Sequence, residues 1–326
     1  MHILITGAAG MIGRKLTERL VKDGALNAKP IDKLTLTDVV TPQKPSGFAG
    51  KVEASTDDLP APDVTEKLIA ARPDVIFHLA GVVSGEAELD FSKGYRVNLD
   101  GMLFLLEAIR RTKDYHPKFV FTSSIAVYGA PFPPAIHDEF HLTPLTSYGT
   151  QKAICELLLA DYSRRNFLDG VGIRLPTICV RPGKPNKAAS GFFSNIIREP
   201  LAGQEAVLPV KETVVHTHAT PRAAVGFLIH AAGLSREQLG PRINIAMPGV
   251  SCTVGEQIEA LRRVAGDKVV GRIRREPDEL IMRIVAGWSE RIDAARARKL
   301  GFTAESSFDE IVRTHIEDEL GGKIAA

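Results

Sequence analysis

Cysteines are scarce in this sequence, and it carries no excess of charge of either sign. Cys155, Cys179 and Cys252 are the only cysteines in 326 residues, and no two of them have CxxC spacing. This argues against both a disulfide framework and a cysteine-ligated metal cluster, and favours a reducing compartment. Forty-one basic residues stand against 39 acidic ones, for a formal net charge of +2. The composition therefore gives no reason to expect nucleic acid or an anionic membrane as a partner.

Long hydrophobic runs are missing as well. No stretch reaches the roughly 18 consecutive apolar residues of a membrane-spanning helix. The N-terminal segment MHILITGAAG turns to glycine after a few apolar residues, which is unlike a secretory signal peptide. We therefore expect a cytoplasmic protein.

The sequence does contain short apolar strands that alternate with amphipathic helices. Strands are predicted at 2–6, 33–39, 74–81, 118–129 and 171–180, and helices at 13–24, 64–71, 97–112 and 148–165. After a short helix at 192–203, a helix at 226–235 and a strand at 242–246 are expected to return to the sheet. Buried strands separated by helices indicate an α/β protein with a doubly wound, Rossmann-type parallel sheet.

Three glycines lie between the first strand and the first helix. Gly7, Gly10 and Gly13 in TGAAGMIG suit a tight turn, close approach of a pyrophosphate, and close packing of helix on strand. The helix N-terminus then offers free N–H groups to the phosphates. The alternative is a plain glycine turn, but the position favours a dinucleotide site. Met11 and Ile12, between the second and third of these glycines, are also expected cofactor contacts.

Asp38 ends the second strand, where a carboxylate can accept hydrogen bonds from the adenosine ribose. A carboxylate there would repel a 2′-phosphate, and Val39, Val40 and Thr41 follow it instead of an arginine. NAD is therefore favoured over NADP as the cofactor. Asp57, or its neighbour Asp58, is a weaker candidate for a contact to the adenine amino group.

Tyr148 and Lys152 are four residues apart on one predicted helix, so they share a face. Ser123 and Ser124 lie upstream at the C-terminal end of a predicted parallel strand, the edge where such folds bind ligands. A free phenol has a pKa of about 10, and a nearby ammonium stabilises its phenolate. The three groups together could remove a proton from an alcohol while its hydride leaves. A surface Tyr/Lys pair is the alternative in isolation.

With these motifs in order, the sequence resembles an extended, sugar-epimerase-like short-chain dehydrogenase/reductase over nearly its whole length. The resemblance is carried by TGAAGMIG, Asp38, HLAG (78–81), VNLDG (97–101), SSIAVYG (123–129), YGTQK (148–152) and RLPTICVRPG (174–183). It implies that Tyr148 is the catalytic acid/base, Lys152 its partner and Ser124, four residues before the tyrosine of VYG, the hydroxyl that orients the substrate.

The same resemblance implies the remaining cofactor contacts and the division of the chain. Leu79, Ala80 and Gly81 would run along the cofactor, Asn98 would support it, and Pro176 and Thr177 would face the nicotinamide. Residues 1–175, with a return segment at about 212–248, are expected to form the NAD-binding domain. Residues 176–211 and 249–326 are expected to form a smaller, mostly helical substrate-binding lobe.

Within the family, HLAGVVSGEAELDFSKGYRVNLDG and the segment after residue 174 are most similar to dehydrogenases that oxidise the 2-hydroxyl of a four-carbon sugar acid. A carboxylate is best bound by a bidentate arginine. Arg181 and Arg222 are the candidates, whereas Arg174 is either a third one or a structural residue. Ser84, Thr177 and Asn195 are further candidates for contacts to the substrate, and a solvent-facing loop position is the alternative for Ser84 and Asn195.

Other interpretations remain open. A nucleotide-sugar epimerase or dehydratase with tightly bound NAD would use the same fold, and a redox-sensing binding protein would keep only the cofactor site. His216 and His218 have strand spacing without further ligands nearby, so we predict no metal. The apolar faces of the helices at 97–112 and 148–165 favour a homodimer built from four helices.

Overall fold

The computed structural model describes residues 1–183 and 190–325, which form two compact units. The first comprises Met1–Val127, Thr146–Arg174 and Val225–Ile245, and the second comprises Tyr128–Leu145, Leu175–Ala224 and the residues from Ala246 onward.

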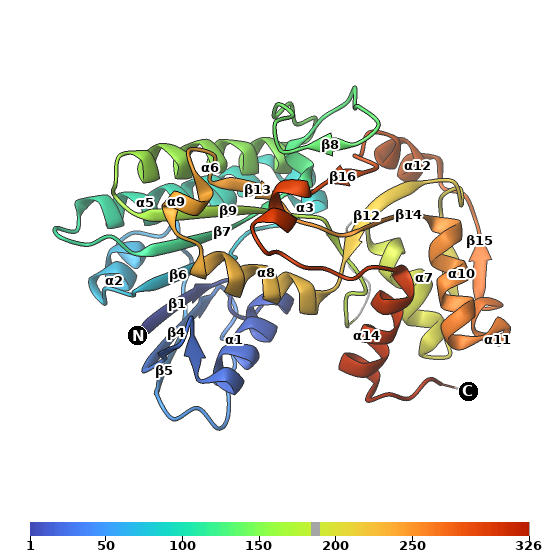
Figure 1. Ribbon diagram of the computed structural model, residues 1–326, viewed down its shortest axis with the longest axis horizontal. Helices are drawn as coiled ribbons and strands as arrows, with labels where there is room; N and C mark the ends of the chain where they lie inside the picture. The colour runs from blue at the N-terminus through green and yellow to red at the C-terminus, as the bar shows by residue number, and fades with distance from the viewer. Residues whose placement is uncertain (184–189, 326) are drawn as a thin grey trace. The chain divides into compact units, whose positions relative to one another are not determined.

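A seven-stranded sheet organises the first unit (Figure 1). Its strands are β1 (His2–Thr6), β4 (Lys33–Asp38), β5 (Lys51–Thr56), β6 (Val75–His78), β7 (Lys118–Ser124), β9 (Asp169–Leu175) and β13 (Asn244–Ala246). The order is β13-β9-β7-β6-β1-β4-β5, and the pairs β4–β5, β1–β4, β1–β6 and β6–β7 are parallel. The order reverses at β1, as in a doubly wound fold that binds a ligand at its switch point.

Helices cover both faces of this sheet. They are α1 (Met11–Asp23), α2 (Val64–Ala70), α3 (Ser84–Leu89), α4 (Phe91–Gly94), α5 (Gly101–Arg111), α6 (Ser147–Arg164) and α9 (Arg236–Leu239), together with the part of α8 (Pro221–Gly233) from Val225 onward. A π-helical turn (Tyr95–Asp100), a 3₁₀ turn (Ile125–Val127) and the small strands β2 (Ala25–Leu26) and β3 (Lys29–Pro30) complete the unit. In Figure 1, α5 and α6 lie side by side on one face, and α1 lies on the other. Ile3, Leu4 and Ile5 are fully buried, because both faces of β1 are covered.

The predicted strands and helices of this unit are present, with several local differences. The strand predicted at 171–180 ends at Leu175, and the short strand Thr177–Ile178 after it belongs to another sheet. The helix predicted at 97–112 begins within a π-helical turn, and the strand predicted at 74–81 ends at His78. The strand predicted at 118–129 ends at Ser124, because Ile125–Val127 forms a 3₁₀ turn. The edge strand β5 was not predicted, since KVEAST is partly exposed along most of its length and lacks the continuous apolar run of the inner strands.

The second unit is built from short elements around its own core. These are β8 (Ile136–His137), β10 (Thr177–Ile178), α7 (Gly191–Leu201), β11 (Ala206–Leu208), β12 (Val215–Ala219), β14 (Val250–Thr253), α10 (Val254–Ala265), α11 (Asp267–Val270), β15 (Ile273–Arg275), α12 (Glu279–Ala286), β16 (Ile292–Asp293), α13 (Ala295–Lys299) and α14 (Phe308–Leu320). Strands β10, β12 and β14 form one sheet. Phe193 of α7, Leu261 of α10 and Ile311 of α14 belong to a single buried cluster.

These units differ from the predicted domains in two segments. Residues 128–145 group with the second unit, where β8 pairs with β16, although the prediction assigned all of 1–175 to the first domain. The predicted return segment at about 212–248 is shorter, at Val225–Ile245. The reason is that β12 pairs with β10 and β14 of the second unit.

Candidate cofactor and active site

The glycine loop after β1 is packed so tightly that side chains do not fit. Gly7 has a φ of +72°, and a Cβ atom there would lie 2.6 Å from the Ala80 nitrogen and 2.7 Å from the Leu79 carbonyl carbon. A Cβ on Gly13 would meet the Gly7 oxygen even more closely. The loop therefore holds the start of α1 directly against the segment that follows β6.

The N-terminus of α1 is suited to an anion. Gly10 occupies the N-cap position without a side-chain cap, and the first turn carries no acidic residue. The first amide groups of the helix are thus left to an external acceptor, and the helix dipole favours a negative charge there. These features fit the pyrophosphate of a dinucleotide.

Asp38 lies at the end of β4, beside this loop. One carboxylate oxygen accepts a hydrogen bond from the Ala9 N–H at 3.0 Å, and the other accepts from the Val40 N–H at 3.3 Å. Asp57 accepts from the Thr37 hydroxyl at 2.9 Å, whereas the Asp58 carboxylate pairs with Arg96. Asp57 and Asp58 are the two alternatives for an adenine contact, and Asp58 is the one whose carboxylate is already engaged in an ion pair.

Asn98 is hydrogen-bonded to the segment that follows β6. It is buried in the π-helical turn, accepts from the Val82 N–H at 2.8 Å and donates to the Val82 carbonyl at 3.2 Å. It also donates to Gln151 Oε1 of α6 at 2.7 Å. A Cβ on Gly81 would lie 2.9 Å from Asn98 Oδ1 and 3.6 Å from Lys152 Nζ. Asn98 thus ties the expected path of the cofactor to the helix that carries Tyr148 and Lys152.

Tyr148 and Lys152 lie one turn apart in α6, whose N-cap Thr146 accepts from the Gly149 N–H. The buried Lys152 ammonium donates to the Thr122 carbonyl at 2.9 Å and lies 5.7 Å from the centre of the Tyr148 ring. Ser124 Oγ accepts from the Ala126 N–H at 3.1 Å, which leaves its own proton available to a ligand. A phenol, an ammonium and a hydroxyl donor therefore come from α6 and the end of β7.

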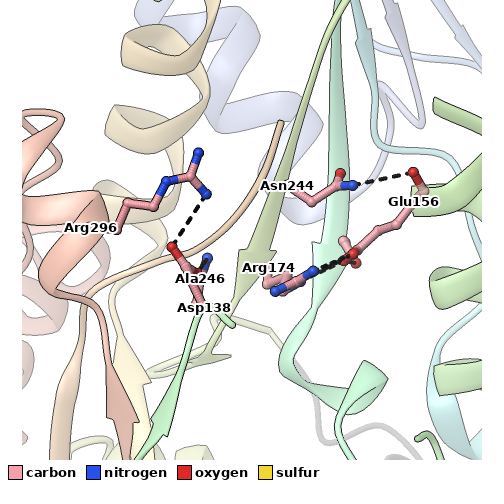
Figure 2. A network of polar contacts seen from close by, with 7 residues as sticks. Asp138, Glu156, Arg174, Asn244, Ala246 and Arg296 are labelled. Carbon is pink, nitrogen blue, oxygen red and sulfur yellow. Dashed lines mark hydrogen bonds and ion pairs between the residues drawn. The ribbon is translucent and has the colours of Figure 1, made fainter. Parts of the chain in front are cut away.

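Ser123 and Arg174 belong to a buried ionic contact. Arg174 is bonded to both carboxylate oxygens of Glu156, and the Ser123 hydroxyl donates to the same carboxylate. Figure 2 shows the guanidinium of Arg174 facing Glu156. Of the alternatives for Arg174, the structural one is therefore supported. Ser123 thus donates its proton within the protein, whereas none of the residues that the structure describes accepts the proton of Ser124.

The remaining candidates, apart from Ser84 at the start of α3, lie in the second unit. Thr177 of β10 is hydrogen-bonded to His216 Nε2 at 2.7 Å, while His216 Nδ1 donates to the Ser289 carbonyl at 2.8 Å. Since that carbonyl can only accept, the proton sits on Nδ1 and the Thr177 hydroxyl donates to Nε2. Pro176 immediately precedes Thr177.

The arginines of this unit differ in their partners. Arg181 donates from Nε to the Ile178 carbonyl and from Nη2 to the Ser190 hydroxyl. Asn195 accepts from Arg198. Arg222 is paired with Glu317 and Asp318 of α14, and the Asp318 carboxylate raises its pKa. With two acidic partners already in place, Arg222 is the weaker of the two candidates for a substrate carboxylate.

Sequence reasoning did not single out Glu156, Gln151 or a partner for His216. Glu156 follows Lys152 by four residues, and this spacing could have indicated a side chain on the same face. No local pattern links His216 to Thr177, 39 residues away. Within residues 1–183 and 190–325, no three His, Cys, Asp or Glu side chains form a group that could hold a metal ion. The described helices include none long and apolar enough to cross a membrane.

Buried histidines predict a loss of stability in mild acid, and His218, whose pKa burial also lowers, adds to His78 and His216. Burial lowers the pKa of His78 to about 3 and that of His216 to about 4. Below pH 6.5 these histidines are protonated in the unfolded chain but stay neutral in the folded chain. As the pH falls, the free energy of unfolding should therefore decrease by up to about 1.4 kcal/mol per pH unit for each histidine. Urea midpoints measured from pH 7.5 to 5 should fall below pH 6.5, and a flat profile over that range would contradict the assignment.

Comparisons with known proteins show what this chain is similar to. The family model described as "NAD dependent epimerase/dehydratase family" matches residues 3–222. The chain is 48% identical to D-erythronate dehydrogenase of Cupriavidus necator over 98% of both chains. It is 42% identical to D-erythronate dehydrogenase of Haemophilus influenzae over 98% of this chain and 100% of that one.

A solved structure gives the same fold. The crystal structure of a nucleoside-diphosphate-sugar epimerase from Agrobacterium tumefaciens has a TM-score of 0.98 and 69% identity, covering 100% of this chain and 96% of that one. The predicted Rossmann-type fold is thereby confirmed. From the family match and the full-length relatives it follows that this chain belongs to the NAD dependent epimerase/dehydratase family.

Proposed function

We propose that this protein is an NAD-dependent dehydrogenase that oxidises the 2-hydroxyl of a small sugar acid, converting D-erythronate to 2-dehydro-D-erythronate. The observation that carries the proposal is its similarity, over 98% of the chain, to two proteins named D-erythronate dehydrogenase. The glycine loop, Asp38 and the Tyr148–Lys152 pair supply what such a reaction needs.

The cofactor site would use the loop after β1 and the segment after β6. Gly7, Gly10 and Gly13, with Met11 and Ile12 at the start of α1, would hold the pyrophosphate, and Asp38 would accept from the ribose hydroxyls. The other proposed contacts are Asp57, Leu79, Ala80, Gly81, Asn98, Tyr148, Lys152 and Pro176. NAD, when bound, accepts the hydride that leaves the substrate carbon.

The hydrogen bonds of the first unit support the catalytic roles that we propose. The Ser124 hydroxyl, with its oxygen already accepting from Ala126 N–H, would donate to the substrate oxygen and orient it. Tyr148 would take the proton of the alcohol. Lys152, fixed by its bond to the Thr122 carbonyl, would stabilise the phenolate and use a remaining N–H for the cofactor ribose.

Ser84, Thr177, Arg181 and Asn195 are the proposed substrate contacts. Because Thr177 donates its proton to His216, its oxygen would offer only lone pairs and accept a hydrogen bond from a ligand. Arg181 is proposed to bind the carboxylate, since a guanidinium matches its geometry.

A nucleotide-sugar epimerase is the second candidate. It is favoured by the 69% identity to the Agrobacterium tumefaciens protein, which is named a nucleoside-diphosphate-sugar epimerase. The Ser124, Tyr148 and Lys152 arrangement serves either reaction, because both begin with the removal of a proton and a hydride from an alcohol.

An assay for NADH distinguishes the two candidates. Purified protein would be mixed with NAD and, in turn, C4 to C6 aldonates, uronates and UDP-sugars, with absorbance followed at 340 nm. Net NADH with D-erythronate is the expected result. Conversion of a UDP-sugar to its epimer, with no NADH from any acid, would replace the proposal by the second candidate.

Asp38 should decide between NAD and NADP. Asp38→Ala is expected to weaken NAD binding and to narrow its advantage over NADP, since the ribose acceptor and the negative charge are both removed. Asp38→Asn keeps an acceptor for the Ala9 N–H and so isolates the effect of the charge. Asp58→Asn, at the neighbouring ion pair, is the control and should leave the NAD/NADP affinity ratio unchanged. The ratio is measured by titrating both cofactors; equal ratios in wild type and Asp38→Ala would refute the ribose contact.

We also propose a homodimer and a cytoplasmic location. Phe104 of α5 and Leu157 of α6 are 42% and 67% exposed on the neighbouring helices in Figure 1, and burial of such side chains favours self-association. The three cysteines are free and buried, as is usual for a protein in a reducing compartment. Light scattering of the purified protein would test the dimer.

A further inference from the structure

Glu156 is the centre of a buried polar network in the first unit. Arg174 of β9 donates to it from Nε at 2.9 and 3.1 Å and from Nη2 at 2.7 Å, and the Ser123 hydroxyl of β7 donates at 2.5 Å. The side chain of Glu156 is 1% exposed and that of Arg174 is 8% exposed. Asn244 of β13 donates to the backbone carbonyl of the same glutamate at 3.2 Å, as Figure 2 shows. Three strands of the sheet therefore contact one residue of α6.

The position of Glu156 on α6 relates this network to the proposed catalytic groups. Tyr148, Lys152 and Glu156 follow one another at intervals of four residues, so they lie along one stripe of the helix. Lys152 contacts the Thr122 carbonyl, and Glu156 contacts the side chain of the next residue, Ser123. Two successive residues of β7 are thus bonded to α6 immediately before Ser124.

These bonds restrict how the helix can lie on the sheet. A slide or rotation of α6 would break the bonds of Lys152 and Glu156 together. The same displacement would move Tyr148 relative to Ser124, and a misplacement of about 1 Å can reduce turnover about 100-fold. Apolar residues of similar size often replace a buried ion pair without loss of stability, so packing alone does not explain a charge at this position.

We propose that Glu156 is a positioning residue, which holds α6 in register with β7 through its bond to Ser123. In this register the hydroxyls of Tyr148 and Ser124 contact the same substrate oxygen. The inference rests on the catalytic roles given to Tyr148, Lys152 and Ser124 under the proposed function. Arg174 neutralises the carboxylate and directs it toward Ser123.

Two double variants test this role. Glu156→Met with Arg174→Met removes both charges and the acceptor for Ser123, whereas Glu156→Gln with Arg174→Met removes both charges but keeps an acceptor. We expect the first to lower kcat by about tenfold or more, with KM and the NAD dissociation constant within about twofold of wild type. The second should recover most of the lost kcat. Asp161→Asn, at an exposed ion pair of the same helix, should leave all three constants unchanged.

Stability is measured in parallel by urea unfolding. An unchanged kcat in the folded Met/Met variant, or an equal loss of kcat in the Met/Met and Gln/Met variants, would overturn the positioning role. If the Met/Met variant does not fold, Ser123→Ala decides the question, because it removes only the bond to β7. A fall in kcat at constant KM is then expected, and wild-type kcat in Ser123→Ala would overturn the proposal.

Failure of the proposed function is distinguishable from failure of this inference. A wild-type protein that is inactive on sugar acids but converts UDP-sugars would refute the dehydrogenase proposal. The same comparison of kcat would then be made with the UDP-sugar, since positioning of Tyr148 against Ser124 serves both reactions.

Discussion

Tyr148→Phe is expected to reduce kcat by about 10²- to 10⁴-fold, the usual contribution of a general acid–base group. The change removes only the hydroxyl that would take the proton of the substrate. Among the described residues no side chain is hydrogen-bonded to that hydroxyl, so its loss should not disturb the packing of α6. NAD affinity should stay within about twofold of wild type, because the other proposed cofactor contacts are retained. Initial rates of NADH formation and a fluorescence titration with NAD provide the two measurements.

The matched control is Tyr162→Phe on the same helix. The Tyr162 hydroxyl donates to the Glu107 carboxylate. This hydrogen bond involves neither Lys152 nor Ser124. Turnover in this variant should equal that of wild type. Wild-type turnover in Tyr148→Phe, or equal losses in both variants, would remove Tyr148 from the catalytic assignment.

The parts of the site that could be predicted from the sequence are those set by short-range spacing. Gly7, Gly10 and Gly13 recur within seven residues between a strand and a helix, and Tyr148 and Lys152 are one helical turn apart. Such patterns are fixed by the period of the helix or by the geometry of one turn, so no tertiary contact is needed to recognise them.

Partners that are far apart in the sequence could not be predicted in this way. The sequence makes Arg222 a candidate for the substrate carboxylate, but it does not show the contacts with Glu317 and Asp318 of α14, about 95 residues later. Likewise, the partner of Arg174 is Glu156, 18 residues before it on a different element. Charge and residue type indicate that an arginine will bind a carboxylate, but the fold decides which one.

The same reason explains why the assignment of residues 128–145 to the second unit could not be predicted from the sequence. This segment continues directly from β7, and nothing local separates it from the first unit. It belongs to the second unit because β8 adds to β16, more than 150 residues later. Parallel pairing of two-residue strands leaves no periodicity that could be read from the chain.

Gly7→Ala is expected to weaken NAD binding by about 10- to 100-fold. Two costs are combined at this position. The positive φ of Gly7 disfavours any side chain, and the new Cβ would lie 2.6 Å from backbone at Ala80. The nearest atoms, the Ala80 nitrogen and the Leu79 carbonyl carbon, both belong to the backbone. No side chain can turn aside, so the segment Leu79–Gly81 must move. Overpacking of this kind costs about 1–3 kcal/mol. When the displaced segment contacts the ligand, the middle of that range, about 1.4–2.7 kcal/mol, corresponds to about 10- to 100-fold in a dissociation constant.

Gly24→Ala separates these two costs. Gly24 ends the same helix α1 with a φ of +62°, but a Cβ there would have no heavy atom within 4 Å. The variant therefore has the backbone strain without the collision, and should lower the free energy of unfolding by about 1–2 kcal/mol while NAD affinity stays unchanged. NAD titrations and urea midpoints of both variants provide the comparison. If Gly24→Ala weakened NAD as much as Gly7→Ala, general strain in α1 would explain the loss. If only Gly7→Ala did so, the contact between the glycine loop and the segment after β6 would be established as part of the cofactor site.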